Sequence, residues 1–179
     1  FSANRVDEST SLTGRPDLAS SRVAFAFNPT NQTGAQPGHG FLNAHIVAGF
    51  NNGSGSALVD SGSYHYGLGI APWALVGSTA IFGSTLTTQG SYESTAYGAG
   101  ARISTNSWTF VDQFQNPIPD YESEAQSFDK IVRDARPGTA GNQEYVVVFA
   151  ASNNGPGSNS VSTPATAKNV ITVAAGENN

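Results

Sequence analysis

The sequence contains neither cysteine nor methionine among its 179 residues. A disulfide framework and a thiolate metal site are therefore excluded. The chain is nevertheless long enough to bury a hydrophobic core, so its stability requires no covalent cross-link. The absence of cysteine does not by itself decide between a reducing and an oxidising compartment.

Charged residues are also scarce, at 12% of the sequence, and Lys plus Arg number 8 against 13 Asp plus Glu. A protein with a net charge of -5 and so few cationic side chains is unsuited to electrostatic binding of nucleic acid or of an anionic membrane surface. No apolar run approaches the roughly 18 residues that a membrane-spanning helix needs. We therefore expect neither a nucleic-acid partner nor a membrane partner.

The polarity of the sequence comes instead from Ser, Thr, Asn and Gln, a composition common in extracellular proteins, so we expect secretion. The chain begins at Phe1 without a charged segment followed by an apolar one, and we expect a signal segment to be absent or already removed. There is no internal repeat and no shift in composition. We therefore expect a single domain over residues 1–179.

The distribution of apolar residues predicts alternating strands and helices. Short apolar segments predict strands at residues 22–27, 74–82, 101–108, 145–151 and 170–174. Helical spacing of apolar residues predicts a helix that begins just after His39 and another over residues 121–135. This alternation favours βαβ units in a mostly parallel sheet, with ligands beyond the carboxyl ends of its strands.

Gly38-His39-Gly40 lies at the junction between a loop and the first predicted helix. A histidine between two glycines has little side-chain crowding and can project into a cleft, where its imidazole can serve as a general base. These three residues alone are also compatible with an ordinary loop histidine.

Asn153 follows the apolar strand predicted over residues 145–151. An asparagine at the carboxyl end of a buried strand can aim its side-chain amide at a developing oxyanion. The alternative is a tight turn, because Asn153-Asn154-Gly155 is also the composition that a chain reversal requires.

Ser107 and Trp108 lie at the end of the strand predicted over residues 101–108. One interpretation is a strand edge that pairs with an extended peptide through backbone hydrogen bonds. The other is a core strand with a buried indole.

The order and context of these segments resemble the subtilisin-like serine peptidases, the subtilases of peptidase family S8. The segments that carry the resemblance are HGFLNAHIVAG at 39–49 (similar to HGTHVAGxxAG), GIAP at 69–72 (GVAP), Ser107-Trp108 (the substrate-binding strand), VVFAASNNG at 147–155 (VVxAAGNxG), and STPA at 162–165 with NVITV at 169–173 (YPA…NVITVGA). Together they cover about residues 38–179.

The resemblance implies a three-layer α/β fold with a parallel sheet, incomplete in this chain, and a serine endopeptidase that acts on polypeptide substrates by acyl transfer. It implies that His39 is the general base and that Asn153 is the oxyanion donor. The substrate contacts that it implies are Ser107 and Trp108 at the peptide-receiving edge, and Ala151 and Ser152 on the wall of the side-chain pocket.

The GTSxAxP turn that carries the serine nucleophile of this family does not occur in the 179 residues. We therefore expect the serine to lie outside this chain, in a remaining part of the peptidase domain that continues the polypeptide or belongs to a second chain. This chain alone is then expected to be inactive. The nearest rival nucleophile is Ser61 or Ser63 beside His65.

The acid member of the triad has two candidate positions. Residues 15–18, RPDL, resemble the HPDL that follows shortly after the catalytic aspartate of the family, and this spacing indicates Asp7. Glu8-Ser9 replaces the usual small pair after that aspartate, so Asp7 is also compatible with a solvated loop carboxylate. In that case the catalytic aspartate lies upstream of Phe1.

Other positions depart from the family pattern. Phe41 replaces a small threonine beside the base, and Thr109 and Ser152 stand where glycine is usual, so their added side-chain atoms are expected to narrow the pocket. His45 also falls at a glycine position and is interpreted as a packed helix residue. The resemblance requires no cofactor; structural calcium is common in the family, but no loop here is specific enough to name ligands.

Two other classes of function remain open at this point. The chain is alternatively a catalytically dead pseudoprotease, or peptide-binding module, of a secreted protein, or it is a structural domain. A GTSxAxP motif downstream and a DSG motif upstream distinguish the peptidase from the binding module. The structural domain is distinguished by whether His39 and Asn153 face one cleft, because the peptidase needs both at a single reacting carbonyl.

Overall fold

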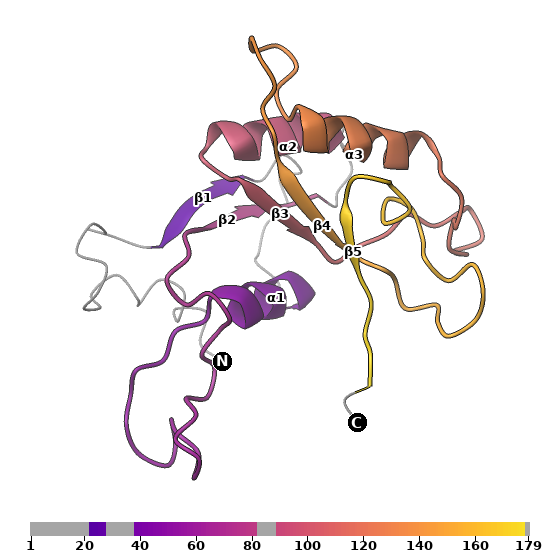
Figure 1. Ribbon diagram of the computed structural model, residues 1–179. Helices are drawn as coiled ribbons and strands as arrows, with labels where there is room; N and C mark the ends of the chain where they lie inside the picture. The colour runs from indigo at the N-terminus through magenta and orange to yellow at the C-terminus, as the bar shows by residue number, and fades with distance from the viewer. Residues whose placement is uncertain (1–21, 28–37, 82–88, 178–179) are drawn as a thin grey trace. The chain divides into compact units, whose positions relative to one another are not determined.

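The computed structural model describes residues 22–27, 38–81 and 89–177. The chain divides into two compact units, Phe1–Leu86 and Thr87–Asn179. Each unit is described by itself, because the positions of the parts relative to one another are not determined (Figure 1). The single domain expected for the whole chain therefore stays a prediction.

The first unit contains a pair of parallel strands. β1 (Val23–Phe27) and β2 (Val76–Thr79) are hydrogen-bonded to each other, and α1 (His39–Ala48) lies between them in the sequence. Parallel strands require a crossover that returns the chain to the same end of the pair, and α1 belongs to that crossover. The first unit is therefore a βαβ arrangement, as the sequence predicts.

Several hydrogen bonds hold the carboxyl end of α1. Arg22 is fully buried, and its guanidinium donates to the carbonyl of Ala48 over 2.6 Å and to that of Ala74 over 2.8 Å. The backbone N–H of Ile70 also donates to the carbonyl of Ile46 over 3.1 Å. A buried charge is tolerated only when it is hydrogen-bonded in this way. These contacts fix α1 against the residues that precede β2.

The second unit contains a three-stranded parallel sheet with the order β3-β4-β5. Its strands are β3 (Ile103–Asn106), β4 (Val146–Ala150) and β5 (Ile171–Val173). α2 (Gln89–Gly98) and α3 (Ser123–Arg133) lie on the same face of this sheet (Figure 1). Because the strands are parallel, their carboxyl ends meet at one edge of the sheet.

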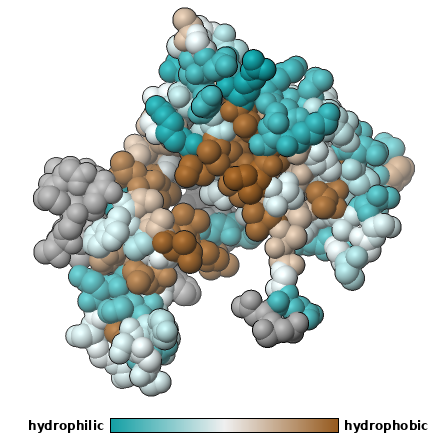
Figure 2. Space-filling model, in the orientation of Figure 1, coloured by the Kyte–Doolittle hydropathy of each residue, from teal (hydrophilic) through white to brown (hydrophobic). Residues whose placement is uncertain are grey.

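The core of the second unit lies between α3 and the sheet. Phe128 of α3 and Phe149 of β4 are fully buried, with ring centroids 4.8 Å apart. Alternate residues of β4 face α3, so Val147 is buried in the same core. The other face of the sheet is exposed within this unit, and Figure 2 shows apolar side chains gathered over these strands. The exposed residues there are Ile103, Val146, Ile171 and Val173.

The α/β fold class with parallel strands is confirmed. Each predicted strand contains an observed strand that is shorter at one or both ends. For example, the strand predicted over residues 74–82 is observed as β2, Val76–Thr79. α2 is missing from the sequence prediction because QGSYESTAYG has no clear apolar spacing; its buried Tyr92 and Ala96 hold it in place. In the described ranges, no helix has the length and apolar character that crossing a membrane requires.

Candidate functional site

His39 is the first residue of α1, and its side chain is exposed. Gly38 precedes it at the N-cap without a capping side chain, and a Cβ added at Gly40 would meet no atom within 4 Å. The imidazole therefore stands at an open helix terminus, as a general base that must reach substrate requires. The side chain of Phe41, which is expected to crowd this base, lies outside the described part of the structure.

The other histidines lie in different surroundings. His45 is only 4% exposed, in agreement with its interpretation as a packed helix residue. His65 forms an isolated bridge with Val59, and its Nδ1 is buried without a hydrogen-bond partner. The neighbouring Ser61 and Ser63 are exposed. Among the residues that the structure describes, no group of three or more His, Asp or Glu could hold a metal ion.

The segments that follow β3 and β4 lie side by side at the carboxyl edge of the second sheet. Asn106, the last residue of β3, is in register with Phe149 of β4. Residues 107–108 and 151–153 therefore leave neighbouring strands at the same edge. The N–H of Ala151 donates to the carbonyl of Val173 over 2.9 Å, which extends the pairing with β5. The structure thus brings the predicted substrate contacts and the predicted oxyanion donor together.

Ser152 shapes the turn that presents Asn153. Its φ of 101° lies in the left-handed region that favours glycine. Its Oγ donates to the carbonyl of Ser160 over 2.6 Å and accepts from Asn154 Nδ2 over 2.8 Å. The Asn153 side chain, in contrast, is exposed. Asn154 therefore contributes to the turn. The role of Asn153 as an oxyanion donor stays a prediction.

Two substitutions of Ser152 test whether this backbone is strained. We expect Ser152→Gly to be more stable than Ser152→Ala by about 1 kcal/mol. Both variants lose the same hydroxyl, but only glycine relieves the positive φ. Urea unfolding of the two variants of the full-length protein measures the difference. Equal free energies of unfolding, or a more stable alanine variant, would contradict the strain.

The side chain of Trp108 is partly buried against the core of the second unit. Its ring lies edge-on to Phe149 with centroids 5.2 Å apart, and to Phe110 at 5.4 Å. Its Nε1 donates to Asn106 Oδ1 over 2.9 Å. The indole thus packs against the core, as the core-strand interpretation expects, but Trp108 is only partly buried and lies two residues beyond the end of β3. This leaves the backbone of residues 107–108 as the part that can pair with a peptide.

Thr109 stands at a position where the resemblance expects glycine, and its hydroxyl is used for anchoring. Thr109 Oγ1 donates to the carbonyl of Thr163 over 2.8 Å, and the N–H of Phe110 donates to the same carbonyl over 3.1 Å. Thr163 is fully buried. The segment that follows β3 is therefore held by two hydrogen bonds to the carbonyl of a buried residue.

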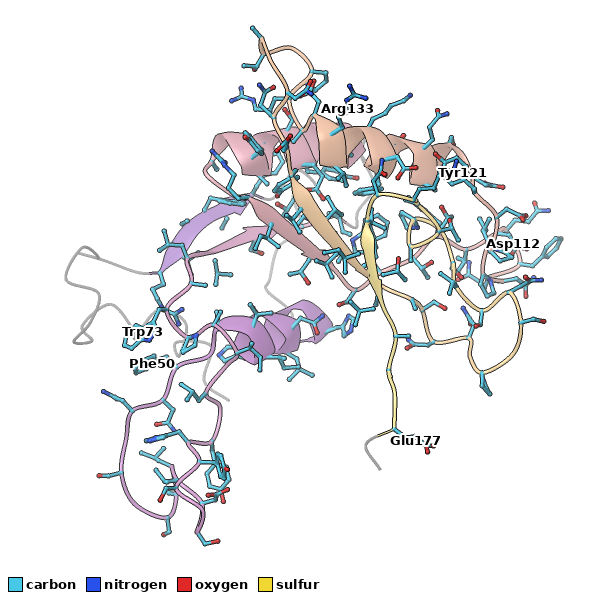
Figure 3. All side chains as sticks on the ribbon, viewed as in Figure 1. Phe50, Trp73, Asp112, Tyr121, Arg133 and Glu177 are labelled. Atoms are coloured by element: carbon cyan, nitrogen blue, oxygen red, sulfur yellow. The ribbon has the colours of Figure 1, made fainter. Side chains whose placement is uncertain are left out.

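A short hairpin loop continues from this segment, bounded by the bridge between Val111 and Pro117 (Figure 3). Asp112 Oδ1 accepts hydrogen bonds from the N–H groups of Asn116 and Phe114, each over 2.8 Å. These bonds, that from Asn116 foremost, lower the pKa of Asp112. The loop is thus held by its own carboxylate, while Phe114 remains exposed near its tip.

Glu93 of α2 is a buried carboxyl that sequence analysis does not single out. It is 7% exposed, its Oε1 accepts from Ser104 Oγ over 2.9 Å, and it is also hydrogen-bonded to Tyr145. Burial raises the pKa of Glu93, and the two hydrogen bonds oppose that rise. The only signal in the sequence is a lone acid beside Tyr92. Without a predicted helix at this position, its burial could not be inferred.

The raised pKa of Glu93 makes stability depend on pH. The folded state holds the Glu93 proton more tightly than the unfolded state does. The contribution of this proton to the free energy of unfolding is therefore fully present below the unfolded pKa of about 4.3, and it is lost as pH rises through the folded pKa. The Glu93→Gln variant has no carboxyl to ionise, so it does not lose this stability as pH rises. We therefore expect the free energy of unfolding of the variant to rise relative to that of the wild type as pH increases from about 4 to about 8.

Urea unfolding of the full-length protein at several pH values measures this change. The matched control is Glu144→Gln, because Glu144 is exposed. The difference in free energy of unfolding between Glu144→Gln and the wild type should stay nearly constant with pH. A pH-independent difference for Glu93→Gln as well would show that Glu93 does not titrate differently in the folded state.

His39 belongs to the first unit and Asn153 to the second. Asp7 lies outside the described residues. The convergence of the base and the oxyanion donor on one carbonyl therefore stays a prediction, as does the choice between Asp7 and an aspartate upstream of Phe1.

A family model described as the subtilase family, peptidase S8, matches residues 6–179 of the chain. The match is wider than the motifs of residues 38–179, and it includes the segment that carries Asp7. No curated protein matches the chain.

Proposed function

Since the chain belongs to the subtilase family, we propose that it forms part of a serine endopeptidase that hydrolyses extended polypeptides by acyl transfer. The observation that carries this proposal is the carboxyl edge of the second sheet. There, the segment at residues 107–108, which follows β3, lies beside the turn that contains Asn153. A peptide paired with the first would have its carbonyls near the second.

In this proposal, His39 takes the proton of the serine nucleophile and later returns it to the leaving amine. Its exposure at the start of α1 supports that role, because a general base must come within hydrogen-bond distance of the reacting group. Asn153 donates its side-chain amide to the oxyanion of the tetrahedral intermediate. Ala151 and Ser152 contribute to the wall of the pocket for the substrate side chain.

The nucleophile and the acid complete the proposed triad. The serine comes from outside the 179 residues, because they contain no GTSxAxP motif. Asp7 is the acid candidate within the chain, and the family match that starts at residue 6 supports it. We also propose that the protein is secreted and that any bound calcium is structural. The reaction itself requires no cofactor.

A serine-directed phosphonate probe tests the proposal on the full-length protein with a complete triad. We expect covalent labelling of the wild type and strongly reduced labelling of His39→Ala, because the base activates the serine. A wild type that binds extended peptides but takes up no label would instead support the alternative, a catalytically dead pseudoprotease or peptide-binding module. Absence of both labelling and peptide binding would remove both functions.

A further inference from the structure

A chain of side-chain hydrogen bonds runs from the interior of the second unit to the peptide-receiving edge. Trp108 Nε1 donates to Asn106 Oδ1 over 2.9 Å. Asn106 Nδ2 in turn donates to Ser104 Oγ over 2.9 Å. Ser104 Oγ donates to Glu93 Oε1 over 2.9 Å. Every donor in the series therefore points toward the same buried carboxyl.

This series crosses a region that is otherwise apolar. Ser104 and Asn106 are two residues apart on β3 and so point to the same face of the sheet, the face on which Val147 and Phe149 are buried. Glu93 is 7% exposed and Asn106 is 9% exposed. Buried polar groups cost stability unless each is hydrogen-bonded, and packing alone could be met by apolar residues. The series thus calls for a role besides packing.

The end of the series at Trp108 indicates that role. The indole is held by its hydrogen bond to Asn106 and by contacts with the rings of Phe128 and Phe149. Its backbone belongs to the segment that leaves β3 at the carboxyl edge. Because the ring and the backbone belong to one residue, the contacts that hold the indole against the core also restrain this segment.

We propose that Glu93 is a positioning residue, which acts through Ser104 and Asn106 to hold Trp108 and thereby the peptide-receiving segment at residues 107–109. Successive bonds polarise one another, so loss of the terminal acceptor weakens the whole series. The inference rests on the proposed function in one respect: the occupant of the segment is taken to be an extended peptide.

The first test follows Trp108 itself and needs no catalytic activity. The indole N–H resonances of the ¹⁵N-labelled full-length protein are recorded, with Trp108→Phe to assign the signal. We expect Ser104→Ala to shift the Trp108 resonance, and Ser104→Thr, which keeps the hydroxyl, to restore it. The matched control is Thr105→Ala, because Thr105 is exposed on the opposite face of β3. A Trp108 resonance that Ser104→Ala leaves unchanged would overturn the proposal.

The second test measures the use of the segment. We expect Ser104→Ala and Glu93→Met to weaken binding of an extended peptide, and to lower kcat/KM for it, by about tenfold to a hundredfold. Hydrolysis of a short ester, p-nitrophenyl acetate, should be unchanged, because it makes no strand contacts. Glu93→Gln keeps an acceptor oxygen and should stay closer to the wild type. Glu144→Gln is the control at an exposed position, and thermal unfolding confirms that each variant is folded.

The outcomes separate this inference from the proposed function. If the wild type binds the peptide without cleaving it and the variants weaken binding, the positioning role is supported and the peptidase is not. If the variants leave both peptide affinity and kcat/KM unchanged, the positioning role is overturned even in an active peptidase. Equal loss on the peptide and on the short ester would also overturn it, because general damage then explains the effect. A wild type that neither binds nor cleaves the peptide overturns both.

Discussion

Replacing His39 with alanine is expected to lower kcat on an extended peptide by roughly 10⁶, a figure that comes from loss of the triad histidine in subtilisin. Without the imidazole, nothing accepts the proton of the serine as its oxygen attacks the carbonyl. The side chain is exposed at the start of α1, so its truncation removes no buried contact and should leave the unfolding temperature unchanged. Steady-state kinetics of the full-length protein, normalised to folded protein, measure the effect.

The matched control for His39 is His65→Gln. His65 lies in a separate loop beside Ser61 and Ser63, the rival nucleophiles, and we expect this variant to keep a kcat close to that of the wild type. The reverse pattern, in which His65→Gln abolishes activity and His39→Ala does not, would move the base to His65. A His39→Ala variant with full kcat would rule out His39 as the general base.

Asn153→Ala is expected to lower kcat by about 10²–10³ with little change in KM, a magnitude that also comes from subtilisin. The side-chain amide is needed only when negative charge develops on the carbonyl oxygen, so its loss raises the barrier without weakening substrate binding. The exposed position of Asn153 after β4 makes a large loss of stability unexpected. The measurement is kcat and KM for one extended peptide, with the unfolding temperature recorded in parallel.

Asn154→Ala distinguishes the two adjacent asparagines. Asn154 Nδ2 donates to Ser152 Oγ, so this variant should loosen the turn and lower stability, but reduce kcat less than Asn153→Ala does. A larger catalytic loss at Asn154 than at Asn153 would exchange their roles. A rise in KM at constant kcat for Asn153→Ala would instead show that its amide binds the substrate in the ground state.

Several elements of the fold follow from local patterns in the sequence. The apolar run at residues 145–151 contains β4, and the helical spacing at residues 121–135 contains α3. The first signal is a short continuous apolar run, which is typical of a strand in a parallel sheet, and the second is an apolar face that repeats with the period of a helix. α2 could not be predicted from a pattern of this kind. Its residues are mostly small or polar, and it is a helix because Tyr92 and Ala96 are buried within the second unit rather than because of an amphipathic repeat.

Much of the candidate site was also visible as sequence. The alternation of strands and helices predicted ligands beyond the carboxyl ends of parallel strands, and the resemblance to the subtilases implied site roles for residues 107–108 and 151–153. The structure shows that both segments follow neighbouring strands at the same edge. The orientation of individual side chains was not visible. The indole of Trp108 packs inward, and Thr109 Oγ1 bonds to the carbonyl of Thr163, a residue 54 positions away in the chain.

The order of residues alone thus predicted the α/β class and the parallel strands, and its motifs indicated His39 and Asn153 as candidates for a base and an oxyanion donor. Those features depend on periodicity and on motifs within a few neighbouring positions. Tertiary structure alone decided that Glu93 is buried, that Asn106 links it to Trp108, and that Ser152 takes a positive φ. Each of these depends on contacts between separate elements, because burial and hydrogen-bond partners are set by what packs around a residue rather than by its own identity.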